Sequence, residues 1–189
     1  MDLPAGLQAI PLDATADTAT LEAAGMIALD IHVQHQEQGN WCWAAVASTV
    51  AKFLSGYSPW SQCAVASAIF PGGKCCENGS SSACDKPCEL DIALEKTGNL
   101  KSPVVNDQVE PADLVSSLKD GKPVCIRIAW ATDKGHFAVI RAASNDGSGA
   151  GHVVISDPIF KESYHDISDL NGNYLNGDGR WTDTYYTQA

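Results

Sequence analysis

The 189-residue chain has the length of a single domain, and its composition excludes several classes of protein. Hydrophobic residues make up 44% and charged residues 19% of the chain, which is ordinary for a globular protein and excludes a wholly disordered one. Lys and Arg total 12 against 23 for Asp and Glu, and the resulting net charge of -11 argues against nucleic acid or anionic lipid as partner, because both require a basic surface.

The cysteines and the N-terminus bear on localisation. No apolar run approaches the roughly 20 residues that cross a bilayer. Residues 1–13 lack the basic start and continuous apolar core of a signal peptide, so either export uses another route or the chain begins after a removed signal. The high local density of cysteines favours the second alternative, since it is typical of disulfides in an oxidising compartment. We therefore predict a secreted protein.

The first 32 residues are predicted to be an N-terminal extension or a pro-segment remnant, ahead of one domain over residues 33–189. Residues 18–25 have the composition of a short helix that ends at Gly25, and the alternating residues 27–33 predict a strand. The hypothesis follows that this extension gates the cleft of the domain.

Residues 41–54 are the clearest predicted helix, because their apolar side chains recur at 3.6-residue spacing. Asn40 is expected to cap the start of this helix, and Gly56 to end it. Cys42 is thereby predicted to lie in the first turn of a mostly buried helix.

A cysteine-rich insert is predicted over residues 63–88, with glycine- and serine-containing loops around it. An alternative to disulfides is a zinc site, but a C-x3-C spacing beside an adjacent pair, with no nearby His, matches zinc ligand patterns poorly. We predict no metal and no cofactor. Because the insert holds an odd number of cysteines, at least one of them is unpaired there. The candidate disulfide cysteines are Cys63, Cys75, Cys76, Cys84 and Cys88.

The rest of the chain changes from helical to strand patterns. Two further helices are expected, over residues 89–96 and, with a proline at its start, over residues 111–119. After residue 123 the pattern predicts strands, which cover residues 124–130, 136–140, 152–155 and 180–187. Helices followed by strands indicate the α+β class, with a helical part packed against an antiparallel sheet.

Cys42 is the first candidate catalytic residue. At a helix start, the unpaired backbone N–H groups and the helix dipole favour a thiolate, which is a nucleophile. Gln36 lies six positions earlier, and its side-chain amide together with the Cys42 N–H would form an oxyanion hole. The alternative interpretation is that Cys42 is a small buried hydrophobe between two tryptophans.

His136 and Asp157 are the candidate partners of that nucleophile. His136 opens an apolar strand after a glycine, where its imidazole can face a helix end and act as general base. Asp157 closes the next strand and can accept the other ring N–H. The alternatives are a half-exposed strand-edge histidine and an ordinary Asp-Pro turn. His152 is a weaker candidate for the base. Asp157 lies five positions further along the same extended segment, and an extended chain holds two such side chains too far apart to bond each other.

Four other side chains are assigned structural or solvent-exposed positions. Trp43 and Trp130 are expected in the core rather than in the site. Cys125, inside an apolar strand, is expected to be a buried thiol. His165 lies in a polar stretch and is predicted to be a solvated loop residue.

The order Gln, Cys at a helix start, His at a strand start and Asp at the next strand end resembles that of bacterial papain-like cysteine peptidases. The similarity extends to the AvrRpt2-like effectors and, more loosely, to bacteriocin-leader peptidases, and runs from about residue 33 to residue 164. The segments that carry it are Trp-Cys-Trp-Ala-Ala at 41–45, Gly-His-Phe-Ala-Val-Ile at 135–140 and Ser-Asp-Pro at 156–158.

The resemblance implies a papain-like fold, a monomer, and a peptide or protein as substrate. It implies Cys42 as nucleophile, His136 as base and later acid, and Asp157 as the residue that orients the imidazole. Gln36 would be the oxyanion donor, although Gln34 and Gln38 lie close enough to compete for that role. Two other functions stay open: deamidation or transamidation by the same triad, and a non-catalytic binding module held by disulfides.

Overall fold

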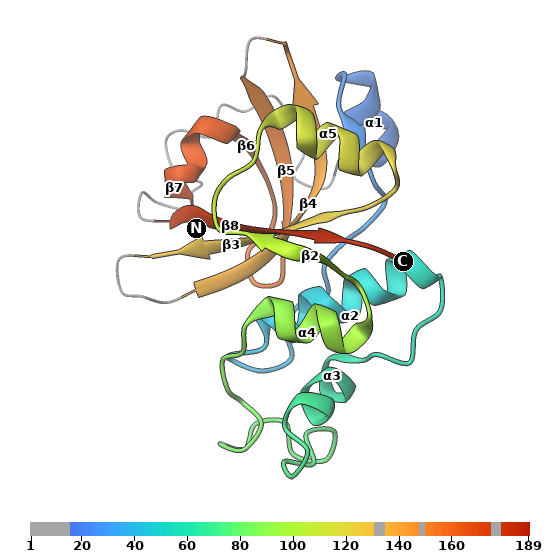
Figure 1. The fold of residues 1–189 in the computed structure, drawn as a ribbon, viewed down its shortest axis with the longest axis vertical. Helices are drawn as coiled ribbons and strands as arrows, with labels where there is room; N and C mark the ends of the chain where they lie inside the picture. The colour runs from blue at the N-terminus through green and yellow to red at the C-terminus, as the bar shows by residue number, and fades with distance from the viewer. Residues whose placement is uncertain (1–15, 131–134, 148–149, 175–178) are drawn as a thin grey trace.

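The computed structural model describes residues 16–130, 135–147, 150–174 and 179–189, and it has a helical part below an antiparallel sheet (Figure 1). The helices are α1 (Thr18–Ala23), α2 (Cys42–Ser55), α3 (Gln62–Ile69), α4 (Leu90–Thr97), α5 (Pro111–Lys119) and the 3-10 helix η1 (Ile167–Leu170). The strands are β1 (Ile27–Ala28), β2 (Leu100–Val105), β3 (Val124–Ala129), β4 (Gly135–Asn145), β5 (Gly151–Asp157), β6 (Lys161–Asp166), β7 (Asn171–Tyr174) and β8 (Gly179–Thr187). The predicted α+β class is confirmed.

The eight-stranded sheet has the order β2-β8-β3-β4-β5-β6, with β1 added to β4 and β7 added to β8. All neighbouring pairs are antiparallel. The strand β4 lies in the middle of this order, where His136 pairs with Ile128 of β3 and Val139 pairs with Ser156 of β5. Because β4 and β5 are neighbours, the start of one and the end of the other lie at the same edge of the sheet.

The described residues form two large hydrophobic cores against this sheet, and a third, smaller cluster packs Leu21, Met26 and Ala28 on Ala142 and Val154. The first core joins α2, α3 and α4 to the sheet, and the second lies under α5 and η1. The helix α2 contacts α3, α4 and β4, so its residues from Cys42 to Ala51 are buried around the whole circumference. The start of α2 is therefore fixed by packing on every side.

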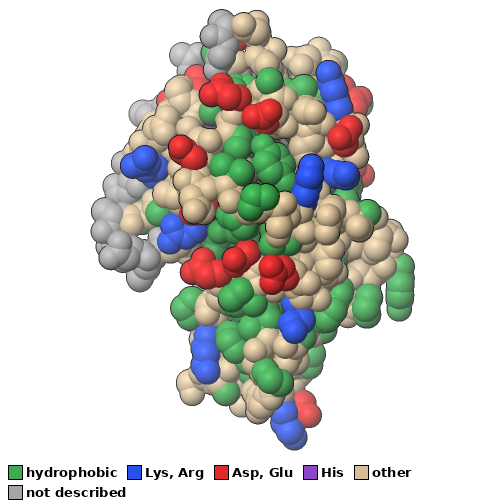
Figure 2. Space-filling model, viewed as in Figure 1, with side chains coloured by type: hydrophobic (Ala, Val, Ile, Leu, Met, Phe, Trp, Pro, Cys, Tyr) green, Lys and Arg blue, Asp and Glu red, His purple; other side chains and the backbone are tan. Residues whose placement is uncertain are grey.

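The surface carries the acidic excess that the sequence predicts. Figure 2 shows Asp and Glu side chains on both parts of the molecule, with several gathered where the helical part meets the sheet. Within the part of the chain that the structure describes, no helix is long and apolar enough to span a membrane.

The cysteine-rich insert contains the helix α3, which the sequence patterns did not predict, and two disulfides. Cys63 pairs with Cys76 and Cys75 pairs with Cys84, while Cys88 keeps a free thiol. One cysteine of the five is thus unpaired, as the odd number requires.

Two tryptophans fasten this insert to the start of α2. The indole Nε1 of Trp41 donates to the carbonyl of Cys84 at 2.9 Å, and that of Trp43 donates to the carbonyl of Lys86 at 3.0 Å. Both rings are fully buried, as expected for Trp43. The disulfide-linked insert and the helix α2 therefore form one packed unit.

The predicted cap of α2 is wrong. The helix begins at Cys42 with Trp41 at the N-cap position, and no side chain caps it. Asn40 instead binds Asp85: the Asn40 backbone N–H donates to Oδ1 at 2.8 Å, and its side-chain amide donates to the same oxygen at 3.1 Å. A partner 45 residues away in the sequence has outcompeted the local capping bond.

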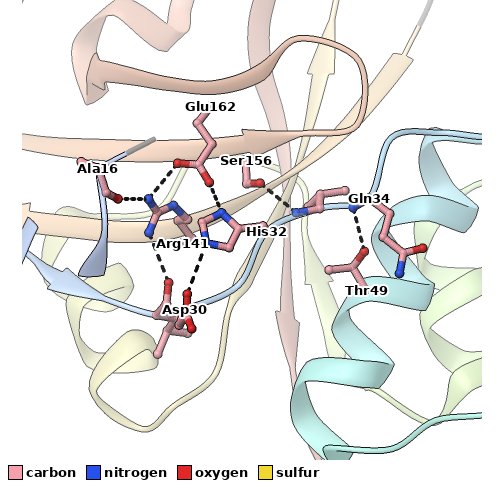
Figure 3. A network of polar contacts seen from close by, with 10 residues as sticks. Ala16, Asp30, His32, Gln34, Thr49, Arg141, Ser156 and Glu162 are labelled. Carbon is pink, nitrogen blue, oxygen red and sulfur yellow. Dashed lines mark hydrogen bonds and ion pairs between the residues drawn. The ribbon is translucent and has the colours of Figure 1, made fainter. Parts of the chain in front are cut away.

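The strand predicted over residues 27–33 is wrong over most of its length. Only Ile27 and Ala28 pair with β4. Beyond them the chain leaves the sheet and is held by separate bonds, such as the Val33 N–H to Ser156 Oγ at 2.9 Å and the Gln34 N–H to Thr49 Oγ1 at 3.2 Å (Figure 3). The segment thus crosses from β5 to α2.

The described part of the N-terminal extension is fastened to the sheet by a buried arginine (Figure 3). Arg141 is fully buried and donates to the carbonyl of Ala16 at 2.6 Å and to Glu162 at 2.7 Å. The other Glu162 oxygen bonds His32, whose second ring nitrogen lies 3.2 Å from Asp30. The division at residue 33 stays a prediction, and residues 1–15 of the extension lie outside the described residues.

The prediction that His165 is a solvated loop residue is wrong. It lies in β6 and is only 5% exposed, because its side chain points inward with that of Ser163. Its Nε2 and the Ser163 Oγ are 2.8 Å apart. Burial lowers the pKa of His165 to about 4, so the ring is neutral at ordinary pH.

Candidate active site

A cleft of about 660 Å³ lies between the start of α2 and the mouth of β4. A volume of this size holds a few side chains of a bound peptide. The helical part contributes Cys42 and Trp43, and the sheet contributes Arg127 and His136. The rest of the lining consists of Gln36, Gly39, Asn40, Pro87, Cys88, Glu89, Trp130, Gly135, Phe137, Ile159 and Phe160.

Cys42 is the first residue of α2 and is 8% exposed at the base of the cleft. The first N–H groups of a helix have no acceptor within the helix, and they carry its partial positive charge. The thiol therefore stands where a negative charge is favoured. Cys42 is buried between two tryptophans, as the alternative interpretation expected. Its thiol nevertheless lines the cleft.

His136 and Asp157 face each other across β4 and β5. The His136 Nε2 lies 2.8 Å from Asp157 Oδ2, and both side chains are almost completely buried. Since Asp157 is a carboxylate, the Nε2 carries the hydrogen. The other ring nitrogen, Nδ1, is left for Cys42, which lines the same cleft and helps to raise the pKa of the imidazole. The structure thus brings together the three residues that the sequence singled out.

The hydrogen bonds and charges within the site shift the pKa values of His136 and Asp157 in opposite directions. Burial lowers the pKa of His136, but its hydrogen bonds to Asp157 and Cys42 and the negative charges there outweigh burial and raise the pKa to about 9. Burial raises the pKa of Asp157, yet the bonds from His136, the Phe160 N–H and Tyr174 outweigh it and hold the pKa below its usual value. Near neutral pH the pair is therefore imidazolium and carboxylate.

Every acceptor position of Asp157 is occupied. Oδ1 accepts the backbone N–H groups of Ile159 at 2.7 Å and Phe160 at 2.9 Å. Oδ2 accepts His136 and the hydroxyl of Tyr174, the latter at 2.7 Å. The sequence analysis missed Tyr174, which follows Asn171-Gly-Asn in the short β7 and has no strand pattern around it. The Asp-Pro turn is thus present, and it anchors the carboxylate.

Gln36 lies in the cleft, but its amide is engaged elsewhere. Nε2 donates to the carbonyls of Gln38 and Gly39, both at 2.8 Å, and Oε1 is buried without a hydrogen-bond partner. Both amide hydrogens are thereby used. A role as oxyanion donor stays a prediction, and it requires the amide to release one of these carbonyls.

Two aromatic rings flank the imidazole. Trp130 and Phe160 each lie with ring centroids 5.9 Å from that of His136. Phe160 is 46% exposed, so it presents an apolar wall to the cleft. The prediction that Trp130 belongs to the core is incomplete, because this half-buried ring packs on the core and lines the cleft as well.

The other histidine and thiol candidates are separated from this trio or differ from it in chemistry. His152 pairs with Asp166 at 2.6 Å and lines a second cavity that Cys42 does not reach. Cys125 is fully buried, which confirms the expected buried thiol, and burial raises the pKa of this thiol. Cys88 shares the cleft with Cys42, but burial raises its pKa to about 11.

The chain is similar to one protein family and, at low identity, to solved structures. Residues 25–171 match the family of the papain-like cysteine protease AvrRpt2. Among solved structures, a double glycine motif protease from an AMS/PCAT transporter, in complex with the leader peptide, is 17% identical, with 86% of this chain and 94% of that chain covered and a TM-score of 0.44. The Pseudomonas avirulence protein AvrPphB is 16% identical, with 85% and 98% covered and a TM-score of 0.38. No curated protein matches the chain.

Proposed function

The chain belongs to the AvrRpt2 family of papain-like cysteine proteases, and from that premise we propose that Cys42, His136 and Asp157 carry out its peptide hydrolysis. One observation supports this assignment above the others: the buried imidazole of His136 bonds Asp157 through Nε2 and lies in the same cleft as the Cys42 thiol, which helps to raise the pKa of His136. A nucleophile, its base and an orienting carboxylate are the minimum for acyl transfer by cysteine.

The reaction begins with the Cys42 thiolate and the His136 imidazolium. The sulfur attacks the scissile carbonyl carbon, and the carbonyl oxygen takes the negative charge. The imidazolium then donates its Nδ1 proton to the leaving amine, so that the C–N bond breaks and a thioester remains on Cys42. Next, His136 removes a proton from water, whose oxygen attacks the thioester. Cys42 leaves as thiolate, the carboxylic acid departs, and the imidazolium is restored.

The oxyanion is stabilised at the helix start. The backbone N–H of Cys42 belongs to the first turn, whose N–H groups have no acceptor within the helix, and it lies beside the sulfur that attacks the carbonyl carbon. Gln36 would add a second donor if its Nε2 turned from the Gly39 carbonyl towards the cleft. We propose that substrate binding makes this exchange, because the displaced carbonyl lies in the cleft lining and can accept from the peptide.

The substrate is a peptide or protein segment that lies across the cleft, with an apolar side chain against Phe160 and Trp130. We also propose that the protein is secreted, since its two disulfides are of the kind that persist in oxidising compartments. Detection of the protein outside the producing cell, with Cys63–Cys76 and Cys75–Cys84 oxidised, would support secretion; an intracellular, reduced protein would contradict it.

The assignment is tested by alkylation with iodoacetamide at pH 7, followed by intact-mass measurement and peptide mapping. Wild type is expected to be labelled rapidly and only at Cys42, Cys42→Ala not at all, and His136→Ala much more slowly. Cys88→Ala is the matched control, since it removes a thiol of the same cleft without touching the pair, and it should be labelled as fast as wild type. Equal labelling of wild type and His136→Ala would contradict the proposed pair.

A further inference from the structure

A buried chain of hydroxyl and imidazole groups leads away from the far side of Asp157. Tyr174 of β7 is fully buried, and its hydroxyl lies 2.7 Å from Asp157 Oδ2. The hydroxyl of Ser163, on β6, lowers the pKa of Tyr174, and the Ser163 Oγ lies 2.8 Å from the Nε2 of His165, whose ring packs on that of Tyr174. The peptidase reaction, as described above, uses none of these three side chains.

The chain of bonds has one direction. A carboxylate only accepts, so Tyr174 must donate its hydroxyl hydrogen to Asp157. The Tyr174 oxygen is then the acceptor for Ser163, whose own oxygen accepts the Nε2–H of His165. Burial keeps the Tyr174 pKa well above its usual value and lowers the pKa of His165, so both groups stay neutral and keep these roles across the working pH range. Three donors in series thus end on the carboxylate, each polarising the next.

Tyr174 and His136 donate to the same oxygen, Oδ2. An oxygen that already accepts one strong hydrogen bond carries less charge for a second one, so the two bonds weaken each other. The bond from Tyr174 is therefore strongest when His136 is neutral and weaker when His136 is an imidazolium. By reciprocity, Tyr174 favours release of the imidazolium proton.

We propose that Tyr174 is a positioning residue of the peptidase site, which shares Asp157 Oδ2 with His136 and so restrains how tightly the carboxylate holds the imidazolium. This inference depends on the function proposed above, because the imidazolium must later give its proton to the leaving amine. An imidazolium held too tightly is a poor acid. Tyr174 also orients the carboxylate, since it fixes Oδ2 while two backbone N–H groups fix Oδ1.

Removal of the Tyr174 hydroxyl should change the pKa of His136 without changing the other charged groups near the imidazole. Cys42 of α2 and Asp157 of β5 contact the imidazole directly. Arg127 of β3 lies over the neighbouring Gly135, where it donates to Thr182 and pairs with Asp183. Glu89, ahead of α4, lines the same cleft. Of these groups, Asp157 alone bonds the Tyr174 hydroxyl, so removal of that hydroxyl leaves the charges of Cys42, Arg127 and Glu89 in place.

The test is the rate of Cys42 alkylation by iodoacetamide as a function of pH, since this rate changes when the neighbouring imidazolium loses its proton and needs no substrate. Peptide mapping measures alkylation at Cys88 separately from alkylation at Cys42. In Tyr174→Phe the inflection that reports His136 is expected to move up by about 0.5–1 pH unit, the equivalent of one neutral hydrogen bond. Ser163→Ala should move it in the same direction by less, because Tyr174 then becomes a weaker donor.

Tyr186→Phe is the matched control, because Tyr186 is a half-buried tyrosine of β8 outside the site, and its profile should equal that of wild type. An unchanged or lower inflection in Tyr174→Phe would overturn the inference, even if labelling slowed equally at every pH, as a purely structural role predicts. If Tyr174→Phe did not fold, the sign of the Ser163→Ala shift would decide. Failure of wild type to label at Cys42 would instead refute the proposed function.

Discussion

The replacement Asp157→Asn tests how the turn after β5 controls the imidazole. An asparagine has one oxygen and one NH2 group in place of two acceptors. If its oxygen faced His136, the NH2 would face the N–H groups of Ile159 and Phe160, which now donate to Oδ1. Each lost bond would cost about 1–2 kcal/mol in this partly exposed loop, or about 2–4 kcal/mol together.

The opposite orientation avoids that cost. With the amide oxygen on the two backbone N–H groups, the NH2 faces the His136 Nε2 and the Tyr174 hydroxyl, which can accept from it. His136 must then keep its hydrogen on Nδ1, where the ring cannot take a proton from Cys42. The expected result is a folded protein whose activity falls roughly 10⁴-fold, as expected for a base in the wrong tautomer.

The measurement combines turnover, or the Cys42 alkylation rate, with a thermal unfolding curve. The pKa of His136 should also fall, because burial then acts without the opposing carboxylate charge. Asp183→Asn, which changes a carboxylate that contacts Arg127 instead, is the matched control and should retain most activity. If Asp157→Asn stayed within tenfold of wild type, the amide oxygen would have to face His136, and the assumption that the two backbone donors decide the orientation would be wrong.

Three further predictions follow from the structure. Peptidase activity should decline as pH rises through about 9, because the raised pKa of His136 marks the loss of the imidazolium proton; a plateau to pH 11 in the rate profile would contradict this. Cys88 should stay unlabelled at pH 7 while Cys42 reacts, since a pKa of about 11 leaves only about 10⁻⁴ of it as thiolate; mapped labelling at Cys88 would refute that. Replacing both Cys75 and Cys84 by Ser should lower stability by about 3 kcal/mol and the midpoint of thermal unfolding by about 6–12 °C, and an unchanged midpoint would show that the disulfide adds nothing.

The parts of the site that the sequence could predict are those set by local pattern. Cys42 follows from the apolar spacing of one helix, and His136 from the start of one apolar strand. Asp157 closes the next strand, and consecutive antiparallel strands bring such positions together, so its distance to His136 follows from connectivity alone. These three residues needed no information about distant contacts.

The errors involve contacts that the local sequence pattern does not show. Asn40 has the right residue type for a helix cap, but Asp85 of the insert binds it. His165 lies in the polar sequence Lys-Glu-Ser-Tyr-His-Asp, which gives no sign of burial, yet Tyr174 packs on its ring with centroids 5.1 Å apart. Tyr174 itself reaches Asp157 only because η1 and β7 return to the sheet. Propensity and periodicity describe neighbours along the chain, whereas these contacts arise from tertiary packing.

Cys42 and His136, the proposed nucleophile and base, lie on different halves of the molecule, so their distance depends on how the halves pack. The sheet side is fixed by the bonds around Asp157. The helix side is fixed by Trp41 and Trp43, whose indoles bind carbonyls of the insert at Cys84 and Lys86. The Cys75–Cys84 disulfide therefore stabilises the acceptor on which Trp41 depends. Because a shift of about 1 Å at reacting groups can cost roughly 100-fold in rate, we expect the insert to affect the proposed catalysis through the position of the helix start.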